Sequence, residues 1–471
     1  KFFEAAKAPV AVVICLSLTA LFYLATEIAR RWQRSSLHLS WSAAGLAVVA
    51  FGFALFFQEY PSIAARPGLL FSFVAISDLF LLALAWRDER LKHLHVLAGG
   101  LAFAVLAIWT GRHLSDALLS WALVAYLGFA VLHTAFPTLL ERVRPGAGAT
   151  WWSQLYPPLA LLLTLGPILK LETLSLLFWP AILAVDLIAV AIALISASLA
   201  GLGLVLVLTL ATAGLCIFKA TALAVSSLSL VLVIGGFAIF FFAAGLFLAK
   251  RLGSRLDVIS GHEGGLSAIF GGPRAQIPAF SALLPFALLV MMSQRLPLAS
   301  PTPIFGLALL FSVLVLGLTR LLAVEWLPAC GLVGVAAVEY AWHIRHFTTA
   351  DAIGPLRWYL AFYALYALFP FVFRRAFSAT TGPWAVAALS GIVQFRLVYD
   401  VVNRTWPNHF LGVLPALFAV VPLASLFAIL RREPDDDGHR LDQLAWFGGA
   451  ALFFITLVFP IQFERQWIDR K

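Results

Sequence analysis

Apolar runs that are each long enough to cross a lipid bilayer recur along the whole chain. A helix of about 18–22 apolar residues covers a bilayer core of roughly 30 Å. The composition agrees with this reading, because 62% of the 471 residues are apolar and 12% are charged, against roughly 45–50% and 25% in soluble domains. Since a helix satisfies its own backbone polar groups, which lipid cannot do, the sequence predicts an all-α polytopic integral membrane protein.

The runs predict about sixteen transmembrane helices. Those of the first half are expected near 9–29, 41–58, 68–86, 94–111, 116–136, 153–169, 174–195 and 199–218. Those of the second half are expected near 226–249, 277–294, 303–322, 323–341, 356–373, 383–403, 410–430 and 443–463. Prolines interrupt the sixth span, and only a short turn around Arg320 separates the eleventh from the twelfth.

Two stretches of the sequence repeat one another. Residues 126–142, YLGFAVLHTAFPTLLER, align without gaps with residues 359–375, YLAFYALYALFPFVFRR. An initial Tyr-Leu, a Phe-Pro pair and a final Arg coincide. Membrane helices share a small alphabet of residues, so chance similarity is the alternative. Matches of several rare residue types in register favour a duplication.

The repeat predicts two domains, 1–222 and 223–471, each an eight-helix membrane unit. Further matches in the same register pair Arg87 with Arg320 and Trp151 with Trp384. Because eight is an even number, both units would enter the membrane in the same direction. The sequence therefore predicts two parallel repeats related by an axis along the membrane normal.

Basic residues distinguish the two membrane faces. The loops after odd-numbered spans carry more than twice as many as the internal loops after even-numbered spans. The first set is Arg30, Arg31, Arg34, Arg87, Arg90, Lys92, Arg142, Arg144, Lys250, Arg251, Arg255, Arg274, Arg320, Arg374, Arg375, Arg431, Arg432 and Arg440. The second set is Arg66, Arg112, Lys170, Lys219, Arg295, Arg345, Arg357 and Arg404. The first set is predicted to face the cytoplasm.

An acid and a base in the fourteenth span are the first candidate site. Arg396 and Asp400 are four residues apart, so they share a helix face and can form an ion pair. Gln394 and Asn403 lie close by. The residues in register in the first half are Leu163 and Pro167, so this polar group is absent from the repeated plan. The alternative is that the two charges only neutralise each other and link helices.

Three further acids, Asp78, Asp186 and Glu339, lie alone inside apolar runs. Ionisable groups are costly within a membrane, so each is expected to face the interior of the bundle or a wet cavity. A proton or cation relay would require such carboxylates in line.

A repeated motif at the predicted outer face is the second candidate site. It consists of Trp109, Arg112, His113 and Asp116 in the first half, and Trp342, Arg345, His346 and Asp351 in the second. One interpretation is an interfacial belt with helix-end anchors. The other is a pair of clusters that bind an anionic headgroup or a glycan, since Arg binds phosphate bidentately.

Signatures of known chemistry are missing from the sequence. It contains no G-x-S-x-G, H-E-x-x-H, Walker A or dinucleotide-binding motif. The three cysteines lie inside apolar runs without metal-ligand spacing. The net charge of +9 is a signal of topology and of contact with lipid headgroups, and no basic stripe points to nucleic acid. We therefore predict no cofactor, no metal and no defined catalytic residue.

The repeated YLAFYALYALFPFVFRR ending and Trp-Arg loops such as LAWRDERLKHLHVLAGG, within 81–100, resemble a family of bacterial predicted membrane proteins, domain of unknown function 2339. The resemblance covers most of the chain. It implies a bacterial inner-membrane protein with many spans, and it implies no defined reaction.

Together these features predict a cell-envelope role. The expected activity is handling or translocating a lipid-linked or anionic molecule, with membrane lipids as partners and Arg396, Asp400 and the outer Trp-Arg-His clusters as contacts. Two alternatives stay open, a membrane-embedded transferase of glycans or lipids and a non-catalytic envelope scaffold.

Overall fold

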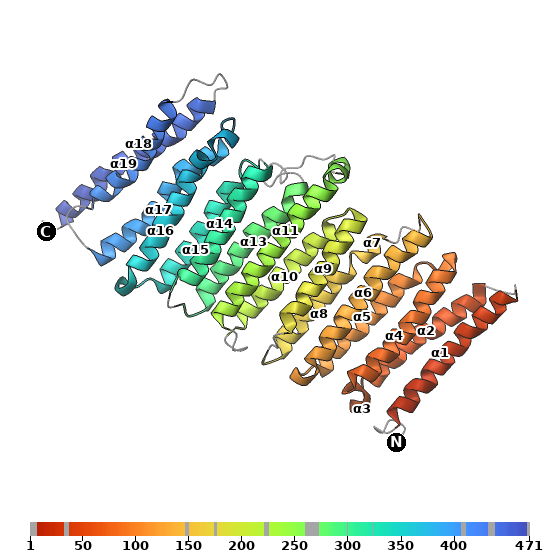
Figure 1. Ribbon diagram of the computed structural model, residues 1–471. Helices are drawn as coiled ribbons and strands as arrows, with labels where there is room; N and C mark the ends of the chain where they lie inside the picture. Colours follow the sequence, from red (N-terminus) through yellow and green to blue (C-terminus); the bar gives the residue numbers. More distant parts are fainter. Residues whose placement is uncertain are drawn as a thin grey trace. The chain divides into compact units, whose positions relative to one another are not determined.

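The computed structural model describes residues 7–32, 37–146, 150–173, 177–220, 226–259, 273–298, 300–322, 324–406, 411–431 and 439–468. Every regular element within these ranges is a helix (Figure 1). The chain divides into two compact units, residues 1–225 and 226–471. The sequence placed its domain boundary between residues 222 and 223.

Within the described ranges, each unit contains eight long helices. Those of unit 1 are α1 (Ala8–Arg31), α2 (Leu37–Phe57), α4 (Pro67–Arg87), α5 (Leu94–His113), α6 (Leu119–Val143), α8 (Tyr156–Lys170), α9 (Phe178–Ser196) and α10 (Ala200–Phe218). Those of unit 2 are α11 (Ser227–Ile259), α13 (Pro273–Arg295), α14 (Thr302–Leu322), α15 (Leu327–His346), α16 (Ile353–Val372), α17 (Gly382–Thr405), α18 (Val413–Leu430) and α19 (His439–Ile468). All sixteen predicted spans are therefore helical.

In the described part of the chain, six short helices lie between the long ones. They are α3 (Pro61–Ala64), η1 (Glu89–Leu91), η2 (Asp116–Leu118), α7 (Thr150–Ser153), η3 (Thr349–Asp351) and η4 (Arg374–Ala376). Several long helices have a proline at their first or second position, for example Pro67 in α4, Pro328 in α15 and Pro383 in α17. Proline suits a first turn, because the amide hydrogen that it lacks has no partner there in any case.

Fourteen helices in the described ranges are long and apolar enough to cross a membrane. The helices outside this group are α8 and α16. The former has only 15 residues, which is short for the roughly 20 that a bilayer core requires. The latter has 20 residues, and Arg357, Trp358 and three tyrosines lower its hydropathy. The described part of the chain thus has the fourteen candidate spans of a multi-span helical membrane protein, and the number sixteen stays a prediction.

The helices of each unit pack in two rows. Within each unit, long helices contact the one that follows and the one after that; for α16 and α18 the contact is the stacked rings of Tyr363 and Phe418. In unit 1 this places α1, α4, α6 and α9 in one row, with α2, α5, α8 and α10 in the other. In unit 2 the rows are α11, α14, α16 and α18, and α13, α15, α17 and α19.

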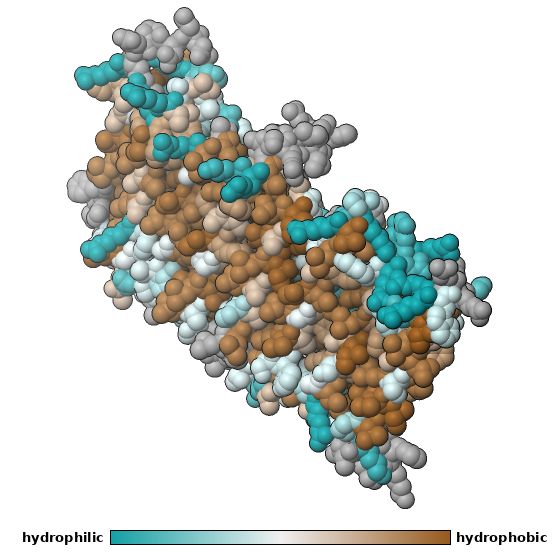
Figure 2. All heavy atoms as spheres, turned by 45° about the vertical axis from the view of Figure 1, so that its right-hand side comes forward, coloured by the Kyte–Doolittle hydropathy of each residue, from teal (hydrophilic) through white to brown (hydrophobic). Residues whose placement is uncertain are grey.

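The surface is more apolar than that of a soluble protein. Large apolar side chains are widely exposed, including Val124, Val333 and Leu452. In Figure 2, apolar residues cover the middle of the helices, and hydrophilic residues gather towards helix ends. Such a contiguous apolar surface is suited to lipid and would not be stable in water. Where the helices pack against one another, large aromatic residues such as Trp109, Trp384 and Phe241 are fully buried.

Glycine permits one of the tightest helix contacts. A Cβ atom added at Gly99 in α5 would lie 2.4 Å from Cε1 and 2.6 Å from the hydroxyl oxygen of Tyr156 in α8. Small residues allow membrane helices to approach in this way. The adjacent Gly100 has no such neighbour, because a Cβ atom added there would meet no described atom within 4 Å.

We therefore predict opposite effects for two adjacent substitutions. Gly99→Ala should lower the free energy of unfolding by about 1–3 kcal/mol, because it overpacks the contact with Tyr156. Gly100→Ala, the matched control, should leave stability unchanged or raise it by up to about 1 kcal/mol. Reversible unfolding in mixed micelles measures both. Equal effects of the two substitutions would contradict the close α5–α8 packing.

Candidate functional site

A chain of polar contacts joins α15, α16 and α17 in unit 2. Asp400 Oδ2 lies 2.8 Å from Nε2 of His343 and 2.9 Å from Nε of Arg404. His343 Nδ1 lies 3.1 Å from the hydroxyl of Tyr359. Because a carboxylate only accepts hydrogen bonds, Nε2 of His343 donates to Asp400, and Nδ1 is left to accept from the Tyr359 hydroxyl. We call Tyr359, His343, Asp400 and Arg404 the Asp400 cluster.

Exposure changes steadily along the Asp400 cluster. The side chain of Arg404 is 60% exposed, that of Asp400 is 18% exposed and that of His343 is 8% exposed. Tyr359 is fully buried. The cluster therefore leads from an accessible cation at the end of α17 to a buried hydroxyl between helices. It is accessible at its Arg404 end.

The predicted pair of Arg396 and Asp400 is not present. Among the ion pairs of the described residues, Asp400 has Arg404 and His343 as its partners, and Arg396 points to an exposed surface. Helix geometry explains the difference. An acid that precedes its base by four residues forms the better pair, and Asp400 precedes Arg404 but follows Arg396. Asn403 lies beside this pair on α17 and is half-buried.

A second polar contact lies deeper between α15 and α17. Gln394 Nε2 donates to Oε2 of Glu339 at 2.5 Å, and both side chains are fully buried. The remaining oxygens, Oε1 of Glu339 and Oε1 of Gln394, have no hydrogen-bond partner among the described residues. The neighbouring Tyr340 hydroxyl donates to the carbonyl of Val393 at 3.3 Å. The structure thus joins two residues that the sequence analysis placed in separate groups.

The two Trp-x-x-Arg-His motifs have mainly structural roles. Trp109 is fully buried, and its Nε1 donates to the carbonyl of Ala64 at 3.0 Å. Trp342 is also buried, against Phe305. A buried indole cannot stack on a sugar, so neither tryptophan can take part in the predicted glycan-binding clusters. The motif instead packs the end of α5 or α15 against the helices beside it.

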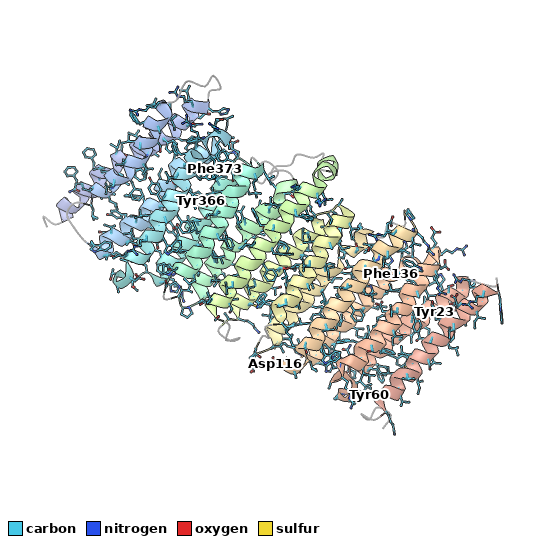
Figure 3. All side chains as sticks on the ribbon, viewed as in Figure 1. Tyr23, Tyr60, Asp116, Phe136, Tyr366 and Phe373 are labelled. Atoms are coloured by element: carbon cyan, nitrogen blue, oxygen red, sulfur yellow. The ribbon has the colours of Figure 1, made fainter. Side chains whose placement is uncertain are left out.

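The charged residues of the motifs lie at helix ends. Arg112 pairs with Glu59, and His346 donates through Nε2 to the carbonyl of Ser293 at 2.8 Å. His113 ends α5, and Arg345 lies in the last turn of α15. The two aspartates lie in η2 and η3, where both are exposed, and Figure 3 shows Asp116 at one end of unit 1. The predicted binding of a headgroup or glycan by the two clusters stays a prediction.

The acids of unit 1 have neutralising or hydrogen-bonding partners. Asp78 in α4 lies 2.9 Å from Nε2 of His133 in α6, and both side chains are buried. Thr209 donates to Asp186 at 2.9 Å. Asp78 and Asp186 thus each have a partner of their own on another helix, and the relay stays a prediction. The described residues contain no group of three His, Cys, Asp or Glu side chains that could hold a metal ion.

The sequence analysis does not predict the partners of two acids, His343 for Asp400 and His133 for Asp78. His343 stands between the Trp and the Arg of the second Trp-x-x-Arg-His motif. One feature of the sequence could have predicted these pairs. A lone histidine and a lone acid inside apolar spans each need a polar partner, so they are expected to meet. The sequence does not say which helices are neighbours.

Comparisons of the chain with protein families, with characterised proteins and with solved structures find no match. The resemblance to domain of unknown function 2339 stays a prediction.

The buried pair in unit 1 makes a second prediction. Asp78→Leu and His133→Leu should each lower the free energy of unfolding by about 3–5 kcal/mol, because each leaves an ionisable group buried without its partner. The double variant should cost less than the sum of the two. A double-mutant cycle of unfolding in mixed micelles measures this coupling, and additive effects would contradict a direct interaction.

Proposed function

We propose that this membrane protein binds an anionic or lipid-linked molecule at the Asp400 cluster. The observation that carries the proposal is the change in exposure from Arg404, at 60%, to His343, at 8%. A ligand phosphate or carboxylate can contact the accessible guanidinium of Arg404, which suits bidentate binding. Its remaining polar groups would then meet His343 and Asp400 in a partly desolvated setting, where hydrogen bonds are stronger.

An asymmetry between the two units supports this location. In register with His343 and Tyr359, unit 1 has Thr110 and Tyr126, whose hydroxyls lie 2.5 Å apart. The same hydrogen bond thus links α5 to α6 and α15 to α16. The residues in register with Asp400 and Arg404 are apolar, Pro167 and Leu171. Unit 2 alone extends the shared contact into a charged chain that reaches the surface.

The duplication is part of the proposal. Twelve of the helix contacts in unit 2 have a counterpart in unit 1 when α11 is matched to α1, α13 to α2, and so on to α19 and α10. His133 and Tyr366, which are in register, both reach across to the facing helix, to Asp78 in α4 and to Ser312 in α14. We propose that two parallel copies share a scaffold and that one of them acquired the site.

The positive-inside pattern places Arg404 on the outer side of the membrane. A bacterial inner membrane and an envelope ligand are consistent with this orientation, and both belong to the proposal.

A membrane-embedded transferase is a second candidate, favoured by the arrangement around His343. Its ring lies between an orienting carboxylate and a hydroxyl, which is the geometry of a general base held by a third group. Accessibility from the Arg404 end also suits a one-sided reaction site better than a route between both faces. In such an enzyme His343→Gln would still bind the ligand but would no longer convert it.

Ligand retention tests the proposal. Wild-type protein, Arg404→Gln and Arg357→Gln are purified alike, and the acidic molecules that remain bound are quantified by mass spectrometry. Arg404→Gln should retain about fivefold less of at least one anionic species, since one interfacial cation contributes about 1 kcal/mol. Arg357 is the matched control, because it is exposed in the same unit and on the same predicted side.

The proposal fails if the two variants and the wild type retain the same anionic molecules in the same amounts. A loss that is equal in both variants also contradicts it, because the effect would then come from net charge alone. Conversion of the retained molecule by wild type, and not by His343→Gln, would favour the transferase.

A further inference from the structure

We propose a second, separate site, a pocket in unit 2 that binds the phosphate of an anionic lipid headgroup. It lies where α14 and α16 end. Three arginines, Arg320, Arg374 and Arg375, line it together with Val372 and Phe373. The hollow has a volume of about 670 Å³, which is large enough for a headgroup. Figure 3 places Phe373 near this end of α16, beyond Tyr366.

Aromatic stacking holds one of the three cations in place. The guanidinium carbon of Arg320 lies 4.4 Å from the ring centroid of Phe373. Stacking uses the flat face of the guanidinium and leaves its N–H groups at the edge, where they can bind phosphate bidentately. Arg374 and Arg375 begin η4 directly after Phe373. Their adjacency brings two more cations to the rim of the same hollow.

Among the described residues, the positive charge of the pocket has no acidic counterpart. No acidic residue is among the described residues that line it. The acid that follows α14, Glu325, is engaged elsewhere, because its Oε1 accepts hydrogen bonds from the backbone amides of Thr381 and Gly382 at 2.8 and 2.9 Å. Three arginines whose described surroundings in the pocket offer no counter-ion therefore select an anion.

The corresponding end of unit 1 shows the contrast. Arg87, in register with Arg320, pairs with Glu27, and Arg30 pairs with the same carboxylate at 2.8 Å. The hollow beside them, about 390 Å³, is lined by Asp88 and Glu89 as well as by arginines. Internal ion pairs balance the charge there. In unit 1 the arginines therefore act as anchors of helix ends. That role does not account for three arginines gathered in one pocket of unit 2.

The surroundings favour a lipid over a soluble anion. Val372, in the pocket lining, is 69% exposed, and Leu321 and Leu368 on the same two helices are 65% and 56% exposed. These side chains offer an apolar track along which acyl chains can lie while the phosphate contacts the arginines. The positive-inside pattern places this end at the cytoplasmic leaflet, where anionic lipids attract basic residues. This site and the Asp400 cluster belong to opposite predicted faces.

Binding of a defined lipid tests the proposal. Full-length protein is placed in phosphatidylcholine nanodiscs, and binding of fluorescent phosphatidylglycerol is titrated. Replacing Arg320, Arg374 and Arg375 by Gln should weaken binding about 100-fold, at about fivefold for each cation. The matched control replaces Arg31, Arg90 and Arg142 by Gln. These arginines lie at the same predicted face of unit 1, and their loss should change the affinity less than about fivefold. Inorganic phosphate is the competitor.

Three outcomes are decisive. A selective loss in the pocket variant, with millimolar phosphate unable to compete, supports a lipid site. A selective loss together with full competition by phosphate supports the phosphate site and assigns it to a soluble anion. Equal losses in both triple variants, or no loss in either, overturn the proposal.

If the pocket variant does not fold, Arg375→Gln alone should still weaken binding about fivefold, and an unchanged affinity would overturn the proposal. The Asp400 cluster is intact in every variant, so these results do not depend on it.

Discussion

The rest of the structure depends on one constraint, which is that lipid and not water surrounds the middle of the helices. Lipid offers no hydrogen bonds, so each backbone polar group must be satisfied within its own segment, and helices are the result. The same constraint applies to side chains. Asp78, Asp186 and Glu339 are all buried, and each meets a partner on another helix, namely His133, Thr209 or Gln394. Polar contacts of this kind link helices that apolar packing alone would not hold in a fixed register.

The two-row arrangement determines where such contacts can form. Each helix touches the next and the next but one, so polar side chains meet where three helices are in mutual contact. Tyr359, His343 and Asp400 come from three such helices, α16, α15 and α17. In unit 1 the equivalent position contains only the hydrogen bond of Thr110 and Tyr126. A shared scaffold can therefore hold either a closed polar link or a charged chain that opens to the surface.

Charge compensation separates structural groups from candidate binding groups. Arg87 and Arg30 share the carboxylate of Glu27, and Asp78 is enclosed with His133. Such groups are neutralised within the protein, so they stabilise it and have little left to offer a ligand. Arg404 remains largely exposed, although it contacts Asp400. Arg320 stacks on Phe373 in a pocket whose described lining contains no acid. In both proposed sites, the charge compensation offered by the described residues is incomplete.

The sequence by itself determined the class of the protein and most of its elements. Runs of apolar residues have a direct physical consequence in lipid, so every predicted span became a helix, from α1 to α19. Hydropathy alone does not identify short or aromatic-rich helices as spans, so α8 and α16 are not among the fourteen candidate spans.

Only the tertiary structure decided which polar residues meet. Spacing along one helix suggested Arg396 as the partner of Asp400, but the structure supplied His343 from another helix and Arg404 from the next turn. Trp109 and Trp342, which the sequence analysis assigned to possible binding clusters, are buried in the structure. The periodicity of a sequence predicts which residues share a helix face. It does not predict which other helix this face contacts. Contacts between helices depend on how close the backbones can approach, as at Gly99 and Tyr156, and that follows from packing in three dimensions.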